Sequence, residues 1–301
     1  MSAVAPPSPA QRASWRRRLG LYVSMLRYGS AHNRDFAREH FAFFERLRAD
    51  VRRHLGELEG LRVLEVGCGK MMWLSLLLHS CGARVTGFDT EWSQPRATPA
   101  KYWRIGRTSG AERALRTLVW DALYARPYYR ELAAVSPFAL RFEGLDCRRM
   151  SVTELDFAAD TFDLVVSHEV FEHLPDVHGA LEAVSRVLRP EGLTYIYTHS
   201  FTSLSGGHHI AWKYPDREPS TTVPPWDHLR ERRFPEIPSW INGWREAQYR
   251  QAFERRFEIV EWLATEREGE ALLTPEIEAE LADYGRDELL IKGFITLARP
   301  R

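Results

Sequence analysis

The sequence predicts an α/β protein with a mainly parallel sheet, and three observations carry this prediction. From residue 61 onward, short apolar segments of strand character alternate with segments of helical periodicity. The first predicted strand runs directly into a glycine-containing turn, LEVGCGKMMW, and the second ends in an acid, Asp89. The chain has 301 residues and 44% hydrophobic content, enough to bury a large core as one elaborated domain or two small ones.

Composition limits the classes of partner. Acidic and basic residues are equal in number, so the chain has no overall attraction to nucleic acid or to an anionic membrane. Its three cysteines are too few and too scattered for a disulfide framework or a four-cysteine zinc site, which suits a reducing compartment. No apolar run approaches the ~20 residues of a membrane span, and the N-terminal residues lack the apolar core of a secretory signal. We therefore expect a cytoplasmic protein of unknown oligomeric state.

Residues 1–57 are expected to form a tail followed by accessory helices. Pro, Ala and Ser dominate residues 1–12, which predicts disorder, whereas apolar residues recur every three to five positions between residues 14 and 56. The basic, amphipathic stretch WRRRLGLYVSMLR suits either weak contact with a membrane surface or packing on the domain, and we favour packing.

Residues 58–301 carry the alternation of strands and helices. Strands are expected at 61–66, 83–89, 147–150, 162–167, 193–200, 257–266 and 290–299, and helices at 71–82, 112–124, 178–188 and 274–285. Two long segments interrupt this alternation, a partly helical one at about 91–141 and an aromatic-rich one at about 201–250. Insertions of this length often carry a function of their own.

The glycine-containing turn is the most informative motif. Gly67 and Gly69 let the backbone turn sharply and approach a ligand at the start of a helix. A dinucleotide fingerprint would need a third glycine where Met72 stands, and the Gly-Lys-Ser/Thr of a phosphate loop is absent. Glu65 precedes the turn, and Asp89 follows Gly67 by 22 residues, where an acid can accept both hydroxyls of a ribose.

These blocks resemble the class I S-adenosylmethionine-dependent methyltransferases. LEVGCGKM is similar to their Glu-x-Gly-x-Gly-x-Gly motif, with Met71 in place of the last glycine; ELDFAADTFDLVVSHEVFEHL is similar to the block around their fourth strand, and RVLRPEGL to the turn before the fifth. The resemblance covers about residues 58–200. It implies a Rossmann-like, doubly wound, mostly parallel sheet of seven strands with N-terminal helices and the two insertions.

The resemblance also implies the residues that bind the cofactor, S-adenosylmethionine. Glu65 orients the turn or the amino acid moiety, Gly67, Cys68 and Gly69 line it, and Asp89 with its neighbour Thr90 lies at the ribose. Ser151 stands where the family often has an acid facing adenine, so Met150 is the alternative contact with the base. His168 follows the fourth strand, at the edge of the cofactor pocket.

The stretch SHEVFEHLPD raises a further question, whether its histidines and glutamates bind a metal. The zinc-protease motif fails, because Glu172 occupies the position of the second histidine. A helix beginning near Glu169 would place Glu169, Glu172 and His173 on one face. Many family members use Glu-His-Leu here only to cap and stabilise this helix, and that interpretation stays open.

The fuller pattern Glu-x-x-Glu-His resembles the ubiquinone-pathway O-methyltransferases and the 2′-O-methyltransferases of small RNA ends, which bind a divalent cation with a further histidine from beyond the fifth strand. The predicted metal ligands are therefore Glu169, Glu172, His173 and His209, with His208 as an alternative to His209. Two carboxylates with imidazoles suit Mn, Zn or Fe(II) better than calcium, and Mg is also considered.

A methyl transfer to a hydroxyl group needs alignment and an acceptor for one proton. His168 and His199, at the ends of neighbouring predicted strands, are the candidate bases, although each could be an ordinary polar residue at a strand terminus. The aromatic segment from Phe201 to Trp244 could be a pocket wall or a packed subdomain. We expect a small hydroxylated acceptor, such as a glycoside; the alternatives are an RNA 2′-O-methyltransferase, which the neutral charge disfavours, and a methyltransferase-like binding protein without activity.

Overall fold

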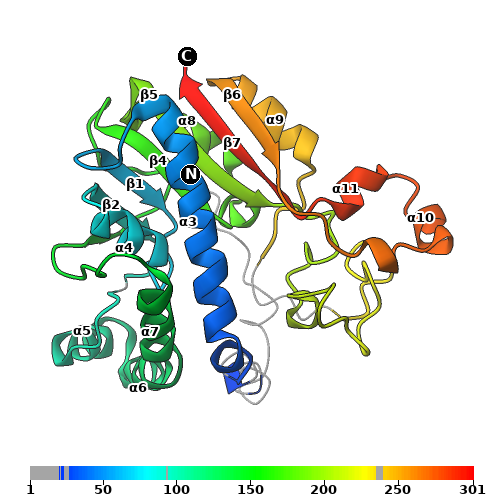
Figure 1. Ribbon diagram of the computed structural model, residues 1–301, viewed down its shortest axis with the longest axis horizontal. Helices are drawn as coiled ribbons and strands as arrows, with labels where there is room; N and C mark the ends of the chain where they lie inside the picture. Colours follow the sequence, from blue (N-terminus) through cyan, green and yellow to red (C-terminus); the bar gives the residue numbers. More distant parts are fainter. Residues whose placement is uncertain (1–19, 21, 24–26, 93, 235–239) are drawn as a thin grey trace. The chain divides into compact units, whose positions relative to one another are not determined.

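The computed structural model describes residues 20, 22–23, 27–92, 94–234 and 240–301. Seven strands form one sheet in the order β3-β2-β1-β4-β5-β7-β6 (Figure 1). β1, β2 and β3 pair in parallel, whereas β7 runs antiparallel to both of its neighbours. The predicted α/β fold with a mostly parallel, seven-stranded sheet is confirmed. The chain divides into two compact units, Leu19–Val166 and, among the described residues of the other, Ser167–Arg301.

The unit Leu19–Val166 contains β1 (Arg62–Val66), β2 (Arg84–Asp89) and β3 (Asp146–Arg149), close to the predicted bounds. α4 (Trp73–Ser80) connects β1 to β2 and is buried along most of its length, which explains why its sequence is apolar on all sides. In register, Val66 lies opposite Phe88, so β1 and β2 end together and present their following turns at one edge of the sheet.

Helices form the rest of this unit. α3 (Asn33–Leu55) buries an apolar stripe against α7 (Arg126–Val135) and ends at Gly56, whose φ of 83° suits glycine. The segment predicted as an insertion contains α5 (Pro99–Ser109), α6 (Ala111–Trp120) and one π-helical turn, η1 (Asp121–Ala125), before α7. Figure 1 shows α5, α6 and α7 gathered together.

The unit Ser167–Arg301 contains the end of β4 (Phe162–His168), and then β5 (Leu188–His199), β6 (Phe257–Ala264) and β7 (Gly293–Pro300). α8 (Val177–Val187) connects β4 to β5, and α9 (Glu246–Glu254) precedes β6. Asp176 caps α8, since its side chain accepts a hydrogen bond from the Gly179 N–H at 2.8 Å.

The expected helix from Glu169 onward is wrong. Only one 3₁₀ turn forms there, η2 (Phe171–His173), and α8 begins after Pro175. Glu169 has a φ of 54°, so it cannot be part of a helix. A proline restricts the preceding residue to extended backbone, which separates the turn from α8. The helix expected at 274–285 is also shorter, as α10 (Pro275–Glu280), and α11 (Arg286–Leu290) follows it.

The aromatic-rich segment after β5 packs, in part, as a small core of its own. Trp212 and Trp226 are buried with Leu204 and with leucines of α11, and the Trp226 indole donates to the Leu289 carbonyl at 3.3 Å. The short helix η3 (Ile210–Trp212) lies in this segment, and η4 (Glu270–Leu272) precedes α10. The sequence left open whether the aromatic residues of this segment line a pocket or pack as a subdomain. For Trp212 and Trp226 the structure shows packing.

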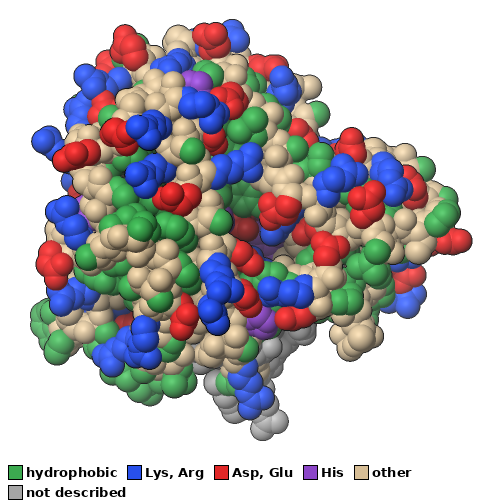
Figure 2. All heavy atoms as spheres, viewed as in Figure 1, with side chains coloured by type: hydrophobic (Ala, Val, Ile, Leu, Met, Phe, Trp, Pro, Cys, Tyr) green, Lys and Arg blue, Asp and Glu red, His purple; other side chains and the backbone are tan. Residues whose placement is uncertain are grey.

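Most of the predicted tail and basic N-terminal helix lies outside the described residues. Of the helices that the structure does describe, none is long and apolar enough to cross a membrane. On the face shown in Figure 2, basic and acidic side chains are interspersed without a large area of one sign, in keeping with the equal numbers of the two kinds.

Candidate active site

The turn after β1 has the geometry that its glycines predict. Gly67 and Gly69 have φ angles of 70° and 60°, which glycine adopts without strain. The Gly69 N–H donates to Asp89 Oδ2 at 3.1 Å, and the Cys68 N–H donates to the Phe88 carbonyl at 3.0 Å, so the turn is fixed to the end of β2. A Cβ built on Gly69 meets no atom within 4 Å, which leaves the space above this residue open to a ligand.

Met72 occupies the position of the third glycine of a dinucleotide fingerprint. It is the N-cap of α4, is fully buried and has a φ of 45°, a left-handed conformation that is uncommon for a residue other than glycine, asparagine or aspartate. Packing holds it there, so the turn keeps its shape without a third glycine.

Glu65 lies beneath this turn. Its side chain is buried and accepts a hydrogen bond from the Ser75 hydroxyl on α4. Burial raises the pKa of Glu65 to about 7. The neighbouring thiol of Cys68 has a strongly raised pKa as well, because it hydrogen-bonds Cys147 and is buried, so it is no nucleophile.

The remaining predicted cofactor residues of this unit follow β2 and β3. Asp89 Oδ1 accepts hydrogen bonds from the Thr90 hydroxyl and the Glu91 N–H, both at 3.2 Å. The Met150 N–H donates to the Asp89 carbonyl at 3.0 Å, which brings the residue after β3 beside the acid. Ser151 instead pairs its hydroxyl with that of Thr153, at 2.9 Å.

A second constellation lies in the unit Ser167–Arg301. Glu172 in η2, His199 at the end of β5 and His208 in the following loop each offer one potential ligand atom, and these atoms lie within 4.8 Å of one another. With ligand bonds of ~2.1 Å, two ligand atoms of a tetrahedral ion are ~3.4 Å apart. The three atoms therefore have to move closer together, by up to ~1.4 Å, to hold a cation.

Glu172 is the least satisfied of the three. It is 1% exposed, yet neither of its carboxylate oxygens accepts a hydrogen bond from a described residue, and His208 Nε2, 4.0 Å from Oε1, is likewise buried without a partner. Burial, with the charge of Glu169, raises the pKa of Glu172 well above its usual range. Burial lowers the pKa of His208 to about 3 and that of His199 well below its usual range, so both imidazoles are neutral and keep a lone pair.

The tautomer of His199 follows from its hydrogen bonds. The Ser205 hydroxyl donates to Glu268 Oε1 at 2.7 Å, so its oxygen accepts from His199 Nε2, which is 2.8 Å away. The Ser205 N–H also donates to Glu268 Oε1. The proton of His199 is therefore on Nε2. The lone pair on Nδ1 is directed away from Ser205 and Glu268 and is free to bind a ligand.

The other acidic and basic residues predicted here lie around this cluster. Glu169 Oε1 is 3.8 Å from His199 Nδ1, and Oε2 is 4.0 Å from His168 Nδ1. Burial would raise the pKa of Glu169, but the positive charge of Lys213 helps to hold it well below its usual range, so this carboxylate is ionised. Burial lowers the pKa of His168 to about 4, and its ring contacts Tyr197.

His173 and His209 are placed differently from the prediction. His173 Nδ1 donates to the Trp240 carbonyl at 2.8 Å, and its ring packs edge-on against His208. His209 Nδ1 accepts from the Ala211 N–H at 3.1 Å and so caps η3. Among the described residues, it is His208 rather than His209 that joins Glu172, with His199 as the third member.

Sequence reasoning missed the residues that hold this cluster in place. Asn242 binds the η2 turn three times, through its N–H to Glu172 O and through its side chain to the carbonyls of Phe171 and Leu174. Tyr249 in turn donates to Asn242 Oδ1 at 2.9 Å. Ser205 and Glu268 are the other missed pair; no local pattern marks either residue, because the partners lie 63 positions apart.

Comparison with known families decides what this architecture belongs to. A family model described as a methyltransferase domain matches residues 36–261, which is most of the chain. The chain belongs to this methyltransferase family. The family predicted from the three sequence blocks is thus confirmed, and with it a Rossmann-like fold of the type that uses S-adenosylmethionine.

Curated relatives of the methyltransferase include ubiquinone biosynthesis O-methyltransferases. That of Rhizobium leguminosarum bv. trifolii is 32% identical over 141 residues, covering 47% of this chain and 41% of the relative. That of Leptothrix cholodnii is 28% identical over 151 residues, covering 49% and 48%. The match thus spans less than half the length of either relative.

Among solved structures, an S-adenosylmethionine-dependent methyltransferase from Mesorhizobium loti has a TM-score of 0.47 and 18% identity, covering 83% of this chain and 96% of the other.

Proposed function

We propose that this methyltransferase transfers the methyl group of S-adenosylmethionine to a hydroxyl oxygen of a small acceptor. The observation that carries the proposal, beside the family match, is the glycine turn fixed to Asp89 through the Gly69 N–H. Open space over Gly69, with Asp89 hydrogen-bonded to the turn, supports the proposal that Asp89 binds the ribose. The names of the curated relatives support oxygen as the methylated atom.

In this proposal the chain's own residues bind and orient the cofactor. Asp89 accepts the ribose hydroxyls, with Thr90 beside it, and Met150 packs on the base, because the Ser151 hydroxyl is engaged with Thr153. Gly67, Cys68 and Gly69 line the amino acid moiety, and Glu65 beneath them supports the turn.

The chemistry asks little more of the protein. The cofactor supplies a methyl group already activated on a sulfonium. As the C–O bond to the acceptor forms, the C–S bond breaks, S-adenosylhomocysteine is left, and the hydroxyl proton moves to a base. His168 is the proposed base, because it is neutral and lies beside the ionised Glu169, which can stabilise the imidazolium. His199, whose Nε2–H is held by Ser205, is assigned to the cluster instead.

The methyltransferase further has a proposed cation site formed by Glu172, His199 and His208. A buried carboxylate whose oxygens accept no close hydrogen bond from the described residues, beside two neutral imidazoles, fits a divalent ion, and the mixed oxygen and nitrogen ligands suit Mn, Zn or Fe(II). Glu169, near His199 Nδ1, is the adjacent carboxylate. A bound cation would lower the pKa of an acceptor hydroxyl, which helps because the low pKa of His168 makes it a weak base.

Two measurements test the cofactor and the acceptor. Calorimetry should show S-adenosylhomocysteine binding, and Asp89→Ala should weaken it about tenfold or more by removing the ribose contact; equal affinity of both proteins would refute the site. Label from methyl-labelled cofactor should appear in a metabolite extract rather than in total RNA or protein. Label in RNA alone would favour the RNA 2′-O-methyltransferase, and no label in any fraction would favour a binding protein.

The cation is tested separately. Purified protein should contain near-stoichiometric metal by elemental analysis, and chelation should abolish transfer while the affinity for S-adenosylhomocysteine stays within about twofold, since the predicted ligands and the glycine turn are different residues. A metal-free, fully active enzyme would rule the cation out. A cytoplasmic location is likewise proposed, because none of the three cysteines forms a disulfide in the described structure.

A further inference from the structure

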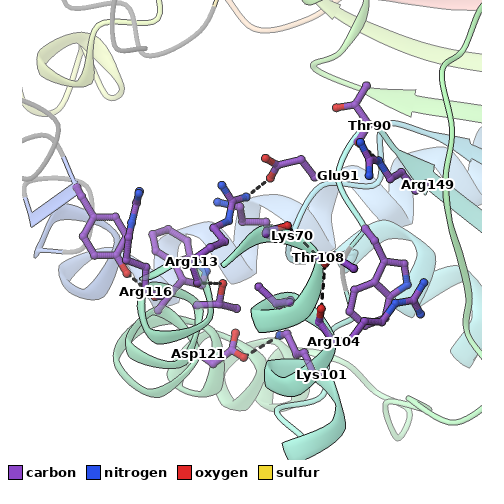
Figure 3. A pocket seen from close by; sticks show the side chains of 16 residues that line it. Lys70, Thr90, Glu91, Lys101, Arg104, Thr108, Arg113, Arg116, Asp121 and Arg149 are labelled. Atoms are coloured by element: carbon purple, nitrogen blue, oxygen red, sulfur yellow. Dashed lines mark hydrogen bonds and ion pairs between the residues drawn. The ribbon is translucent and has the colours of Figure 1, made fainter. Parts of the chain in front are cut away.

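A cavity of about 300 Å³ lies within the unit Leu19–Val166, and the proposed chemistry does not use most of its walls. One side is formed by Lys70, which follows Gly69, and by Thr90, which follows Asp89, so the cavity begins at the proposed cofactor site. The opposite side is formed by α5, α6 and η1 (Figure 3).

Positive charge is in clear excess in this cavity. Its two carboxylates are Glu91 and Asp121, against six cationic side chains: Lys70, Lys101, Arg104, Arg113, Arg116 and Arg149. Both carboxylates are already paired, Asp121 with Lys101 at 2.7 Å and Glu91 with Arg113. Arg116 lies over the Tyr22 ring, and its ion-pair partner is Glu112, 3.9 Å away and outside the cavity lining.

Two of the guanidinium groups have no carboxylate partner in the described part of the chain. Arg104 is stacked over the Trp92 ring at 4.0 Å, and Arg149 donates through Nε to the Thr90 carbonyl at 3.1 Å. Each keeps its terminal N–H groups for another acceptor, and Figure 3 shows both among the residues that line the cavity. Burial, followed by the charge of Arg113, lowers the pKa of Lys70, in keeping with an electropositive site.

The cofactor alone does not explain this excess of charge. S-adenosylmethionine carries a sulfonium, an ammonium and one carboxylate, so its net charge is positive at neutral pH. A protein that binds a cation does not gain by surrounding the adjacent space with unpaired arginines, because like charges in a cavity repel. A second, negatively charged ligand would offset the positive charge of the cofactor and that of the arginines.

We propose that this cavity binds an anionic group of the acceptor, a carboxylate or a phosphate, through Arg104 and Arg149. The assignment rests on the proposed methyl transfer and narrows its substrate to a hydroxylated acid or phosphate ester. Arginine forks suit both groups, since each can receive two parallel hydrogen bonds. The rings of Trp92, Trp120 and Tyr22 supply flat apolar walls for the rest of the molecule.

The test uses inorganic phosphate as the probe, titrated calorimetrically into the full chain at low ionic strength, both alone and saturated with S-adenosylhomocysteine. Saturable binding is expected in both cases. Arg104→Gln and Arg149→Gln should each weaken it about tenfold. Arg107→Gln is the matched control: it lies on the same helix as Arg104, but its guanidinium packs on Trp103 and does not line the cavity, so phosphate affinity should change less than about twofold.

Several results would overturn the proposal. The first is that the wild type does not bind phosphate, and the second is that Arg107→Gln loses as much phosphate affinity as the other two variants. The third is that phosphate competes with S-adenosylhomocysteine and that Arg104→Gln and Arg149→Gln each lose tenfold in S-adenosylhomocysteine affinity. That result would assign the two arginines to the carboxylate of the cofactor. A chain that binds phosphate but not S-adenosylhomocysteine would keep the anion site and refute the proposed function instead.

Discussion

Replacing Glu172 with leucine should stabilise the protein when no divalent cation is present. The carboxyl group is buried, neither of its oxygens accepts a hydrogen bond from a described residue, and burial raises its pKa well above the usual range. Leucine fills a similar volume and has no polar atom to leave unsatisfied. A residue kept at a cost to stability is expected where it serves binding.

The size of the effect follows from the burial of Glu172. An unsatisfied buried polar group costs about 1–3 kcal/mol. An unfolding entropy of ~2.1 cal/mol/K per residue makes 1 kcal/mol equivalent to ~1.6 °C in a chain of this length, so the melting temperature should rise by ~2–5 °C.

The assay is differential scanning calorimetry with chelator and with excess MnCl₂. For the wild type, a cation at 100 times its Kd adds about 2.7 kcal/mol, or ~4 °C on the same scale. Glu172→Leu should lose this shift, because it removes the charged ligand of the site. In chelator the variant should melt at a higher temperature than the wild type. When MnCl₂ replaces the chelator, this difference in melting temperature should therefore shrink or change sign.

Glu182→Leu on α8 is the control, since the Glu182 side chain is largely exposed and, within the described part of the chain, its ion-pair partner is the exposed Arg256. It should change the melting temperature by less than ~1 °C in either buffer and keep the metal shift. If Glu172→Leu is less stable than the wild type in chelator, the carboxyl group makes a stabilising contact and the reasoning is wrong. A metal shift retained in Glu172→Leu would equally refute it.

Three further predictions concern buried polar groups. The pKa of Glu65 is raised to about 7 in the folded protein, so its contribution to stability is present below pH ~4.5 and is lost as the pH rises through 7. Urea denaturation should show that the wild type loses about 3 kcal/mol of unfolding free energy relative to Glu65→Gln between pH 4.5 and 8. Unfolding free energies of the two proteins that change in parallel with pH would contradict this prediction. Ser205→Ala frees the His199 tautomer and should weaken metal affinity about 10–100-fold in a chelator competition, with no loss expected if Ser205 is only a packing residue. Lys101→Met leaves the buried Asp121 unpaired and should cost about 3–5 kcal/mol in urea denaturation, most of it recovered by adding Asp121→Leu; a double variant as unstable as the single one would exclude an ion-pair origin.

The sequence predicted what depends on local pattern. Six of the seven strands lie within three residues of their expected bounds, because apolar runs bounded by turns determine them, and α8 matches the predicted helix to within a residue. β5 instead begins five residues early, at Leu188, within the stretch expected to be a turn. α5 was missed although Thr98 and Pro99 form a recognisable helix start: the Thr98 side chain accepts from the Lys101 N–H. The Glu172 region was misjudged because FEHLP has helical composition, while Pro175 ends the turn after three residues.

Long-range geometry explains the rest of the candidate site. Consecutive histidines at 208 and 209 are equivalent in sequence, and the positive φ of His208, 54°, helps to direct the two side chains to different partners. The sequence gives no sign of this backbone angle at His208 apart from the two glycines, Gly206 and Gly207, that precede it. The excess of positive charge in the cavity has no local sequence signature either, because its cationic side chains come from three separate stretches, at residue 70, at 101–116 and at residue 149, and charges balance over the whole chain.

The support of η2 by Asn242 has a consequence for redesign. The turn that carries Glu172 is held by a segment that begins some seventy residues later, within the stretch predicted to face the acceptor. Exchanging residues 201–250 for those of a relative, in order to change the acceptor, would therefore also remove His208 and alter the support of the proposed cation site. A chimaera that retains Ser205, His208, Asn242, Tyr249 and the chain path through Trp240 is expected to accept new specificity and keep the proposed cation site. One that replaces them would lose both functions together, and its inactivity would say nothing about the new pocket.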